Sequence, residues 1–358
     1  MFFRSKTNVT EAGILKVLSQ VIDPDLQKDI VTLGFVKNLK INGAKVSFDV
    51  ELTTPACPVK DQLKLECEER VKGLEGVESV DVNMTAQVRS SSAGAGKLNI
   101  PGVKNMIAVA SGKGGVGKST VTANLAVALA RSGAKVGLLD ADIYGPSIPL
   151  MFNITDKPLM DGDLVVPVEK EGVKIISMGF FIPDDQPVVW RGPMVHGALT
   201  QFLTQVKWGD LDYLFIDMPP GTGDAQLTIS QNAPLAGAII VTTPQQVSLI
   251  DARKGLKMFQ SVQVPVLGVV ENMSGFVFGK GGGERLAAEN KVPYLGAIPI
   301  DPRVVESGDG GSPVVTSHPQ SESAASFRTL ASRVASELSI TQARYHTPVP
   351  QDLSLEWQ

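Results

Sequence analysis

The chain has 358 residues, which at about 150 residues per domain predicts two domains. Hydrophobic residues make up 43% and charged residues 20%, a composition typical of globular proteins that excludes a chain disordered throughout. The net charge of −4 argues against a broad basic surface for nucleic acid, and no apolar run approaches the roughly 18 residues of a membrane span. We therefore expect a cytoplasmic protein with no nucleic-acid partner and no membrane partner.

The first part of the chain, residues 1–86, predicts a small α+β domain. Its first helix is expected to stop before Asp23-Pro24, because proline disfavours the α conformation in the residue that precedes it. The dipeptide Asn42-Gly43 is a strong signal for a tight hairpin between two strands. The expected elements are a helix over 11–21, strands over 35–41 and 44–52, a helix over 58–72 and a strand over 77–82.

The second part of the chain predicts a larger α/β domain. Residues 87–104 are expected to form a flexible linker, because 90–96 contain only Ser, Ala and Gly. In 105–340, short apolar runs alternate with helical stretches, which is typical of a parallel sheet covered on both faces. Residues 341–358 are expected to be a polar C-terminal tail. Strands are predicted over 107–110, 136–139, 174–177, 213–216, 238–241, 266–270 and 294–298, and helices over 118–131, 194–206, 225–232, 248–261 and 323–338.

A phosphate-binding loop lies between the first strand and the first helix of this domain. The segment Gly112-Lys113-Gly114-Gly115-Val116-Gly117-Lys118-Ser119 matches the pattern G-x-x-x-x-G-K-[ST]. Its glycines let backbone N–H groups approach phosphate oxygens, and the helix that begins there adds the positive end of its dipole. We expect residues 112–120, Thr120 included, to bind the nucleotide, with Lys118 on the β- and γ-phosphates and the Ser119 hydroxyl on Mg²⁺.

Acidic residues follow two of the predicted strands. Asp140 and Asp142 come after the second strand, and Asp217 ends the strand over 213–216. Because the carboxyl ends of parallel strands meet at one edge of a sheet, these carboxylates are expected to converge on the nucleotide. Asp217 is predicted to hold Mg²⁺ through water, and either Asp140 or Asp142 to position the attacking water.

Several motifs, in this order, resemble the Mrp/ApbC iron–sulfur cluster carriers of the ParA/MinD superfamily of deviant P-loop ATPases. They are residues 111–120, 140–149, 190–193, 217–224, 241–245 and 271–274. The segments Asp23-Pro24-Asp25-Leu26 and Thr54-Pro55-Ala56-Cys57-Pro58 resemble the small domain of iron–sulfur assembly factors. The resemblance implies a doubly wound, mostly parallel sheet preceded by that domain.

The same resemblance implies an activity and its partners. A member of this family hydrolyses ATP with Mg²⁺, forms a nucleotide-linked homodimer, and delivers a [4Fe–4S] cluster to apoproteins together with assembly factors. By this resemblance Lys113 reaches across to the partner's nucleotide, Asn272 helps to recognise the adenine, and residues 299–302 border it.

The chain departs from the family pattern at the cluster site. Cluster-binding members carry a C-x-x-C pair shortly after the segment that matches 271–274, and two protomers supply four thiolates. Here the chain continues with Gly275-Phe276-Val277-Phe278-Gly279, and its only cysteines are Cys57 and Cys67. Cys57 precedes a predicted helix whose N-terminus is expected to lower its pKa, so it is the candidate reactive thiol or cluster ligand. Cys67 is expected to be a packing residue.

Three functions remain open. The first is an ATPase that carries or assembles iron–sulfur clusters, with any cluster labile and dependent on Cys57. The second is an ATP-dependent scaffold that holds no metal. The third is a positioning ATPase like MinD or ParA, which the sequence disfavours because 341–358 contain one Arg and no Lys, too few for a basic membrane-binding helix.

Overall fold

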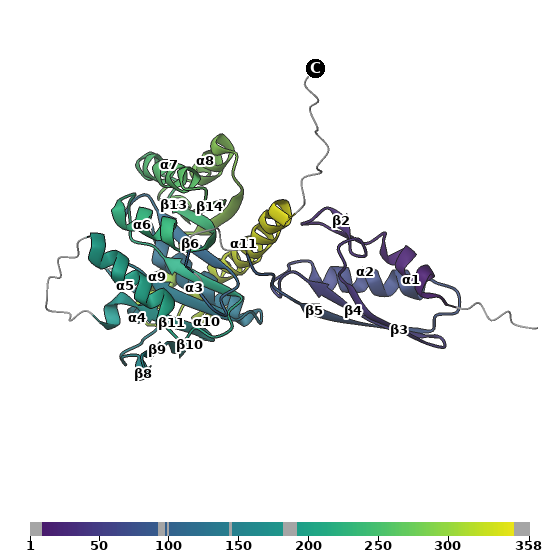
Figure 1. Ribbon diagram of the computed structural model, residues 1–358. Coiled ribbons are helices and arrows are strands. Elements are labelled where there is room, and N and C mark those ends of the chain that lie inside the picture. The colour runs from purple at the N-terminus through teal and green to yellow at the C-terminus, as the bar shows by residue number, and fades with distance from the viewer. Residues whose placement is uncertain (1–8, 92–96, 99, 143–144, 182–191, 347–358) are drawn as a thin grey trace, which may run out of the picture.

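The computed structural model describes residues 9–91, 97–98, 100–142, 145–181 and 192–346, and it contains a small N-terminal unit and a larger α/β unit (Figure 1). The small unit has a three-stranded sheet in which the middle strand pairs antiparallel with one neighbour and parallel with the other. Its elements are α1 (Glu11–Leu18), β1 (Ile22–Asp23), β2 (Lys28–Asp29), β3 (Val36–Asn42), β4 (Lys45–Leu52), α2 (Lys60–Lys72) and β5 (Ser79–Ala86).

The core of the small unit forms where the two helices cover the sheet. Ile14 and Leu18 of α1, Phe48 of β4 and Cys67 of α2 are buried in one apolar cluster. Cys67 is completely inaccessible to solvent, which fits the packing role expected for it. The unit therefore has its own core, as the predicted α+β domain requires.

The larger unit is built on an eight-stranded sheet with the order β10-β11-β7-β12-β6-β13-β14-β15. All neighbouring strands are parallel except β10, which runs antiparallel to β11 at one edge. The strands are β6 (Met106–Ser111), β7 (Val136–Asp140), β10 (Val168–Lys170), β11 (Val173–Ser177), β12 (Tyr213–Asp217), β13 (Leu235–Thr242), β14 (Val266–Ser274) and β15 (Tyr294–Pro299). Each of the seven strands predicted in this part of the chain is confirmed within a few residues.

Helices cover both faces of this sheet. Alternate residues of β6 belong to different cores: Ile107 and Val109 pack beneath α3 and α11, whereas Ala108 and Ala110 pack beneath α5, α6 and α7. The fold is therefore the doubly wound α/β class that the sequence predicts. The helices are α3 (Lys118–Arg131), α4 (Ile148–Met151), η1 (Met178–Phe180), α5 (Gly192–Thr204), α6 (Asp224–Asn232), α7 (Gln246–Ser261), α8 (Gly282–Asn290), α9 (Pro302–Asp309), α10 (Val314–Ser317) and α11 (Glu322–His346).

Several parts of the larger unit differ from the sequence-based expectation, among them β10, α8 and α9, which are not among the predicted elements. The last helix, α11, continues to His346 rather than ending at 338, because residues 339–346 contain neither glycine nor proline and the first proline follows at 348. A hairpin of β8 (Leu159–Asp161) and β9 (Leu164–Val166) was not predicted, since three-residue strands carry too little periodicity. None of the helices in the described ranges is long and apolar enough to cross a membrane.

The two units meet at a joint beside α11, which runs from the sheet toward the small unit (Figure 1). The hydroxyl of Tyr213, at the start of β12, lies 3.1 Å from the hydroxyl of Thr54, and both side chains are buried. Ala56 and Val88 pack into the core of the larger unit. At the two ends of the segment 87–104, which the sequence predicts to be a flexible linker, Val88 is thus buried and the Lys104 N–H donates to the Leu211 carbonyl at 2.9 Å. Residues 92–96 in its middle lie outside the described part.

Removal of the Tyr213 hydroxyl is expected to loosen this joint. Tyr213→Phe deletes one buried hydrogen bond between the units, at a cost of about 1 kcal/mol, while the Thr54 hydroxyl keeps its bond from the Ala56 N–H. We expect faster trypsin cleavage after Arg89 and Lys97, measured by mass spectrometry under native conditions. Tyr294→Phe, on edge strand β15, is the control and keeps the wild-type rate; equal rates for both variants would contradict the joint.

Candidate functional site

The phosphate-binding loop joins β6 to α3, as its sequence context predicts. Two of its glycines have no room for a side chain: a Cβ on Gly112 would lie 2.1 Å from the carbonyl carbon of Asp251 in α7, and one on Gly117 would lie 2.2 Å from Nδ2 of Asn272. Gly117 also has a φ of 78°, in the left-handed region. The loop conformation is therefore fixed by close packing on both sides.

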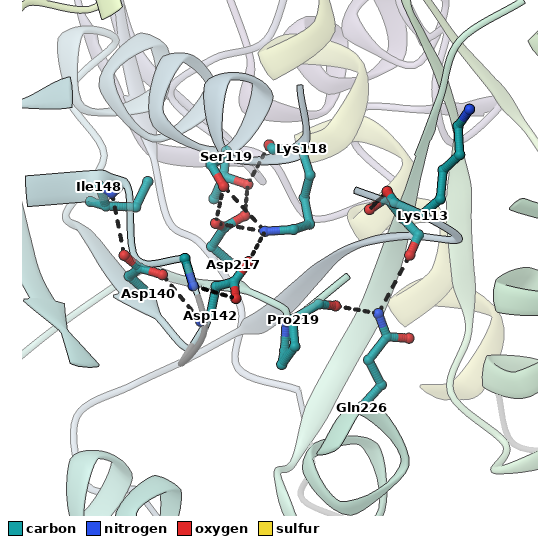
Figure 2. A network of polar contacts seen from close by, with 12 residues as sticks. Lys113, Lys118, Ser119, Asp140, Asp142, Ile148, Asp217, Pro219 and Gln226 are labelled. Atoms are coloured by element: carbon teal, nitrogen blue, oxygen red, sulfur yellow. Dashed lines mark hydrogen bonds and ion pairs between the residues drawn. The ribbon is translucent and has the colours of Figure 1, made fainter. Parts of the chain in front are cut away.

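Asp217 lies at the centre of the polar network beside this loop (Figure 2). Its carboxylate accepts hydrogen bonds from Lys118 Nζ at 2.8 Å, Ser119 Oγ at 2.5 Å and Thr122 Oγ1 at 2.7 Å. Asp217 is completely buried and Lys118 nearly so, and they form an ion pair inside the protein. The structure thus brings together three residues singled out from the sequence, namely Asp217, Lys118 and Ser119.

The second group of carboxylates separates into two environments. The Asp140 carboxylate is held by neighbouring residues. Its oxygens accept hydrogen bonds from Ser177 Oγ at 2.9 Å, Asp142 N at 3.1 Å and Ile148 N at 3.3 Å. Burial, followed by the nearby Asp217 carboxylate, raises the pKa of Asp140 to about 7. Asp142 instead places Oδ2 4.0 Å from Lys118 Nζ. Of the two candidates, Asp142 contacts the lysine of the phosphate-binding loop.

Lys113 lies on the other side of the loop. Figure 2 shows its side chain extending away from Lys118 and Asp217, and its backbone carbonyl accepts a hydrogen bond from Ser111 Oγ at 2.9 Å. The Lys113 ammonium group therefore points away from its own cluster of carboxylates.

Asn272 and Glu271 fix the segment that follows β14. Asn272 is buried, and its Nδ2 donates to the carbonyl of Val116 at 2.9 Å, so this side chain lies against the phosphate-binding loop. The Glu271 carboxylate accepts from Ser274 Oγ at 2.7 Å, Gly281 N at 3.0 Å and Gly283 N at 2.7 Å. These bonds draw the start of α8 back toward the end of β14.

The connection between β14 and α8 is a closed turn. Gly275 and Gly279 exchange two backbone hydrogen bonds of 2.8 Å each, and Phe276 at its tip is 96% exposed. This turn occupies the place where the family resemblance puts a pair of cysteines.

Cys57 lies at the joint between the two units. It lines a cavity of about 410 Å³ together with Arg131 at the end of α3, Ser132 directly after it and Arg328 of α11. Burial raises the pKa of the Cys57 thiol to about 11, so the expectation of a lowered pKa is wrong. The desolvation of the half-buried thiol outweighs the hydrogen bond from the Val59 N–H, which acts in the opposite direction. Within the described ranges, no three His, Cys, Asp or Glu side chains form a metal-binding group.

Two residues of this region were missed in the sequence analysis. Thr122 joins the Asp217 network, and its position one helical turn after Lys118 on α3 was the available signal. Gln226 is buried beside the loop after Asp217, and no pattern in the sequence distinguishes it from other polar helix residues. The tryptophan of the 190–193 motif and residues 143–144 lie outside the described part of the chain.

Comparison with known proteins places both units. The family model of the NUBPL iron-transfer P-loop NTPase (ParA) matches residues 102–335, and the model of an iron-sulfur cluster assembly protein matches residues 11–83. The chain belongs to the iron-transfer P-loop NTPase family. It is 50% identical to the iron-sulfur cluster carrier protein of Synechocystis over 93% of this chain and 99% of the relative. For the iron-sulfur cluster carrier protein of Escherichia coli K12 the identity is 47%, over 91% of this chain and 92% of the relative.

Solved structures share the fold of the larger unit of this iron-transfer NTPase. A nucleotide-binding protein from Archaeoglobus fulgidus in complex with ADP has a TM-score of 0.53 and 41% identity, covering 59% of this chain and 88% of that one. The cell division ATPase MinD of Pyrococcus furiosus has a TM-score of 0.52 and 25% identity, covering 64% and 98%. The resemblance to the ParA/MinD superfamily drawn from the motifs is thereby confirmed.

The raised pKa of Asp140 predicts a pH dependence of stability. Because its folded-state pKa of about 7 exceeds the value of about 3.9 in an unfolded chain, the native protein binds this proton more tightly. Asp140 therefore contributes stability below about pH 4 that is lost as the pH rises through 7. We expect Asp140→Asn to flatten the fall in urea midpoint between pH 5 and pH 8. Asp161→Asn in the exposed β8–β9 hairpin is the control, and equal slopes in all three proteins would contradict the assignment.

Proposed function

We propose that this iron-transfer P-loop NTPase binds and hydrolyses ATP and uses that cycle in the assembly of iron–sulfur proteins. The observation that carries the proposal is the network in which Lys118, Ser119 and Asp217 meet at the start of α3. Lys118 and the backbone N–H groups of the loop would bind the phosphates, whose negative charge the helix N-terminus favours.

The donor set beside the loop fits Mg²⁺. Ser119 Oγ and the Asp217 carboxylate lie 2.5 Å apart, and both are the oxygen ligands that Mg²⁺ prefers. When bound, Mg²⁺ offsets charge on the β- and γ-phosphates. Asp217 would hold the ion through water, and Lys118, released from its contact with Asp217, would bind the phosphate oxygens.

We assign the attacking water to Asp142 rather than Asp140. Asp142 Oδ2 lies 4.0 Å from the Nζ of Lys118, which would bind the γ-phosphate, while Asp142 Oδ1 accepts from the Gly145 N–H. Both oxygens of Asp140 accept hydrogen bonds from residues around β7, and Asp140 forms no ion pair with Lys118 within the described part of the chain. The Asp142 carboxylate would accept a hydrogen bond from the water and orient it for attack. Asn272, which lies against the loop, is the candidate contact for the adenine.

We further propose that two copies of the chain complete the site. The Lys113 side chain points away from its own Lys118–Asp217 cluster (Figure 2), which supports a role toward a nucleotide bound by a second protomer. In that arrangement hydrolysis per protomer rises with protein concentration.

Two substitutions test the ATPase. Lys118→Ala removes a charge-assisted contact to phosphate and is expected to weaken ATP binding about 100-fold, measured with a fluorescent ATP analogue. Asp142→Asn keeps the size of the side chain, so ATP binding is expected to remain and kcat to fall about 100-fold.

The control for Lys118 is another lysine that forms an ion pair with an aspartate. Lys104→Ala removes the partner of Asp212 at the opposite end of β12 and leaves ATP binding and hydrolysis unchanged. Hydrolysis at the wild-type rate by Lys118→Ala would refute the nucleotide site. Loss of ATP binding in Asp142→Asn would give Asp142 a structural role instead.

For the cluster, we propose that Cys57 is the ligand that this chain supplies. Four thiolates hold a [4Fe–4S] cluster, and Cys67 is completely buried in the small unit. The remaining ligands would then come from a client apoprotein or a second copy, and the cluster would be labile. Because the Cys57 thiol has a pKa of about 11, ligation would release a proton and strengthen as the pH rises.

A second candidate function is a metal-free ATP-dependent scaffold. The raised pKa of Cys57, together with the finding that the described ranges hold no group of three metal-ligating side chains, favours it.

Anaerobic reconstitution with iron and sulfide separates the two candidates. The carrier predicts less than one cluster per chain, higher occupancy at pH 8.5 than at pH 7, and loss of iron in Cys57→Ser but not in Cys67→Ala. Wild-type protein without bound iron would assign the scaffold. A full-occupancy cluster that survives Cys57→Ser would refute the role of Cys57.

A further inference from the structure

Gln226 is a buried amide in the first turn of α6, and it contacts both segments that form the nucleotide site (Figure 2). Its side chain is 1% exposed. Nε2 donates a hydrogen bond to the carbonyl of Pro219 at 2.5 Å and lies 3.5 Å from the carbonyl of Ser111. One amide group therefore contacts both the segment before the phosphate-binding loop and the segment after Asp217.

The two carbonyls belong to functionally different segments. Ser111 is the last residue of β6, directly before the phosphate-binding loop, and Pro219 lies two residues after Asp217. The Ser111 carbonyl also accepts the Gly221 N–H at 3.1 Å. Gln226 and Gly221 thus fasten the segment 218–223, which leads from Asp217 to α6, to the start of the phosphate-binding loop.

The other end of the amide is unsatisfied. Gln226 Oε1 is buried and has no hydrogen-bond partner within the described part of the protein. Turning the amide over would bring this oxygen against two carbonyl oxygens, so the donor contacts fix its orientation. A buried acceptor without a partner is unfavourable, and an apolar side chain of similar size would avoid that cost. The presence of an amide at this position is therefore explained by its N–H contacts with the Pro219 and Ser111 carbonyls rather than by a gain in folding stability.

We propose that Gln226 is a positioning residue for ATP hydrolysis, which holds the 218–223 segment against the phosphate-binding loop. This inference rests on the proposed ATPase. When phosphate draws Lys118 away from Asp217, the segment after Asp217 keeps its place through the N–H groups of Met218, Gly221 and Gln226. Binding of ATP depends on Lys118 and the loop amides, whereas hydrolysis also needs Asp217 and its segment in register.

Two variants of Gln226 distinguish the effect of its hydrogen-bond donor from the effect of its side-chain volume. Gln226→Leu removes the amide, and Gln226→Glu keeps the shape but replaces the donor by an oxygen. We expect both variants to lower kcat at least 10-fold at pH 8 while the Kd for ATP changes less than about 3-fold. In Gln226→Glu, protonation restores an O–H donor to Pro219. Its kcat relative to wild type therefore rises as the pH falls, and that of Gln226→Leu stays constant.

Ser230→Ala is the matched control. Ser230 is buried on the same helix, where its hydroxyl donates to the Gln226 backbone carbonyl at 2.7 Å, so this variant perturbs α6 without touching the Gln226 amide. We expect its kcat to remain near wild type. Equal losses in Ser230→Ala and Gln226→Leu, or a parallel loss of ATP affinity in Gln226→Leu, would overturn the positioning role.

A measurement without nucleotide keeps the inference independent of the ATPase. By hydrogen exchange, the Gly221 amide is expected to exchange at least 10-fold faster in Gln226→Leu than in wild type or Ser230→Ala. Unchanged protection in Gln226→Leu would refute the inference even if the chain hydrolyses ATP. A wild-type chain that does not hydrolyse ATP would refute the proposed function, while the exchange data would still decide whether Gln226 holds the segment.

Discussion

The buried ion pair between Lys118 and Asp217 is the interaction around which the rest of the site is arranged. A carboxylate with no access to water is costly unless it is paired and hydrogen-bonded, and Asp217 meets this requirement with three donors from α3. Those donors reach Asp217 because the phosphate-binding loop positions the start of α3 next to the end of β12. The close packing at Gly112 and Gly117 fixes the loop, and through the loop it fixes the donors that stabilise the Asp217 carboxylate.

The neighbouring carboxylate is that of Asp140. Burial, and after it the nearby Asp217 carboxylate, raises the pKa of Asp140 to about 7. The Asp140 carboxyl therefore takes up a proton near neutral pH, beside the ion pair of Lys118 and Asp217.

The sequence predicts the parallel strands and the phosphate-binding loop. It does not predict in which direction individual side chains point or how deeply they are buried. Strands that are buried on both faces of a parallel sheet consist almost entirely of apolar residues, so short apolar runs predict them. The phosphate-binding loop is predicted by its glycine and lysine spacing. Asp140 and Asp142 follow one strand, however, and only the turn after β7 decides which faces Lys118. For Cys57, the sequence shows the nearby helix N-terminus, which favours a lowered pKa, but it does not show the burial that raises the pKa of the thiol.

Two elements of the larger unit have one end at the proposed nucleotide site and the other at the small unit or at the segment that joins the two units. Strand β12 carries Tyr213, bonded to Thr54, at its start and Asp217 at its end. Helix α6 carries Gln226 in its first turn, and the carbonyl of Asn232 at its end accepts the N–H of Leu98, in the segment that joins the two units. Strands and short helices are stiff along their axes. A displacement at the small unit or at the joining segment is therefore transmitted along β12 to Asp217 and along α6 to Gln226.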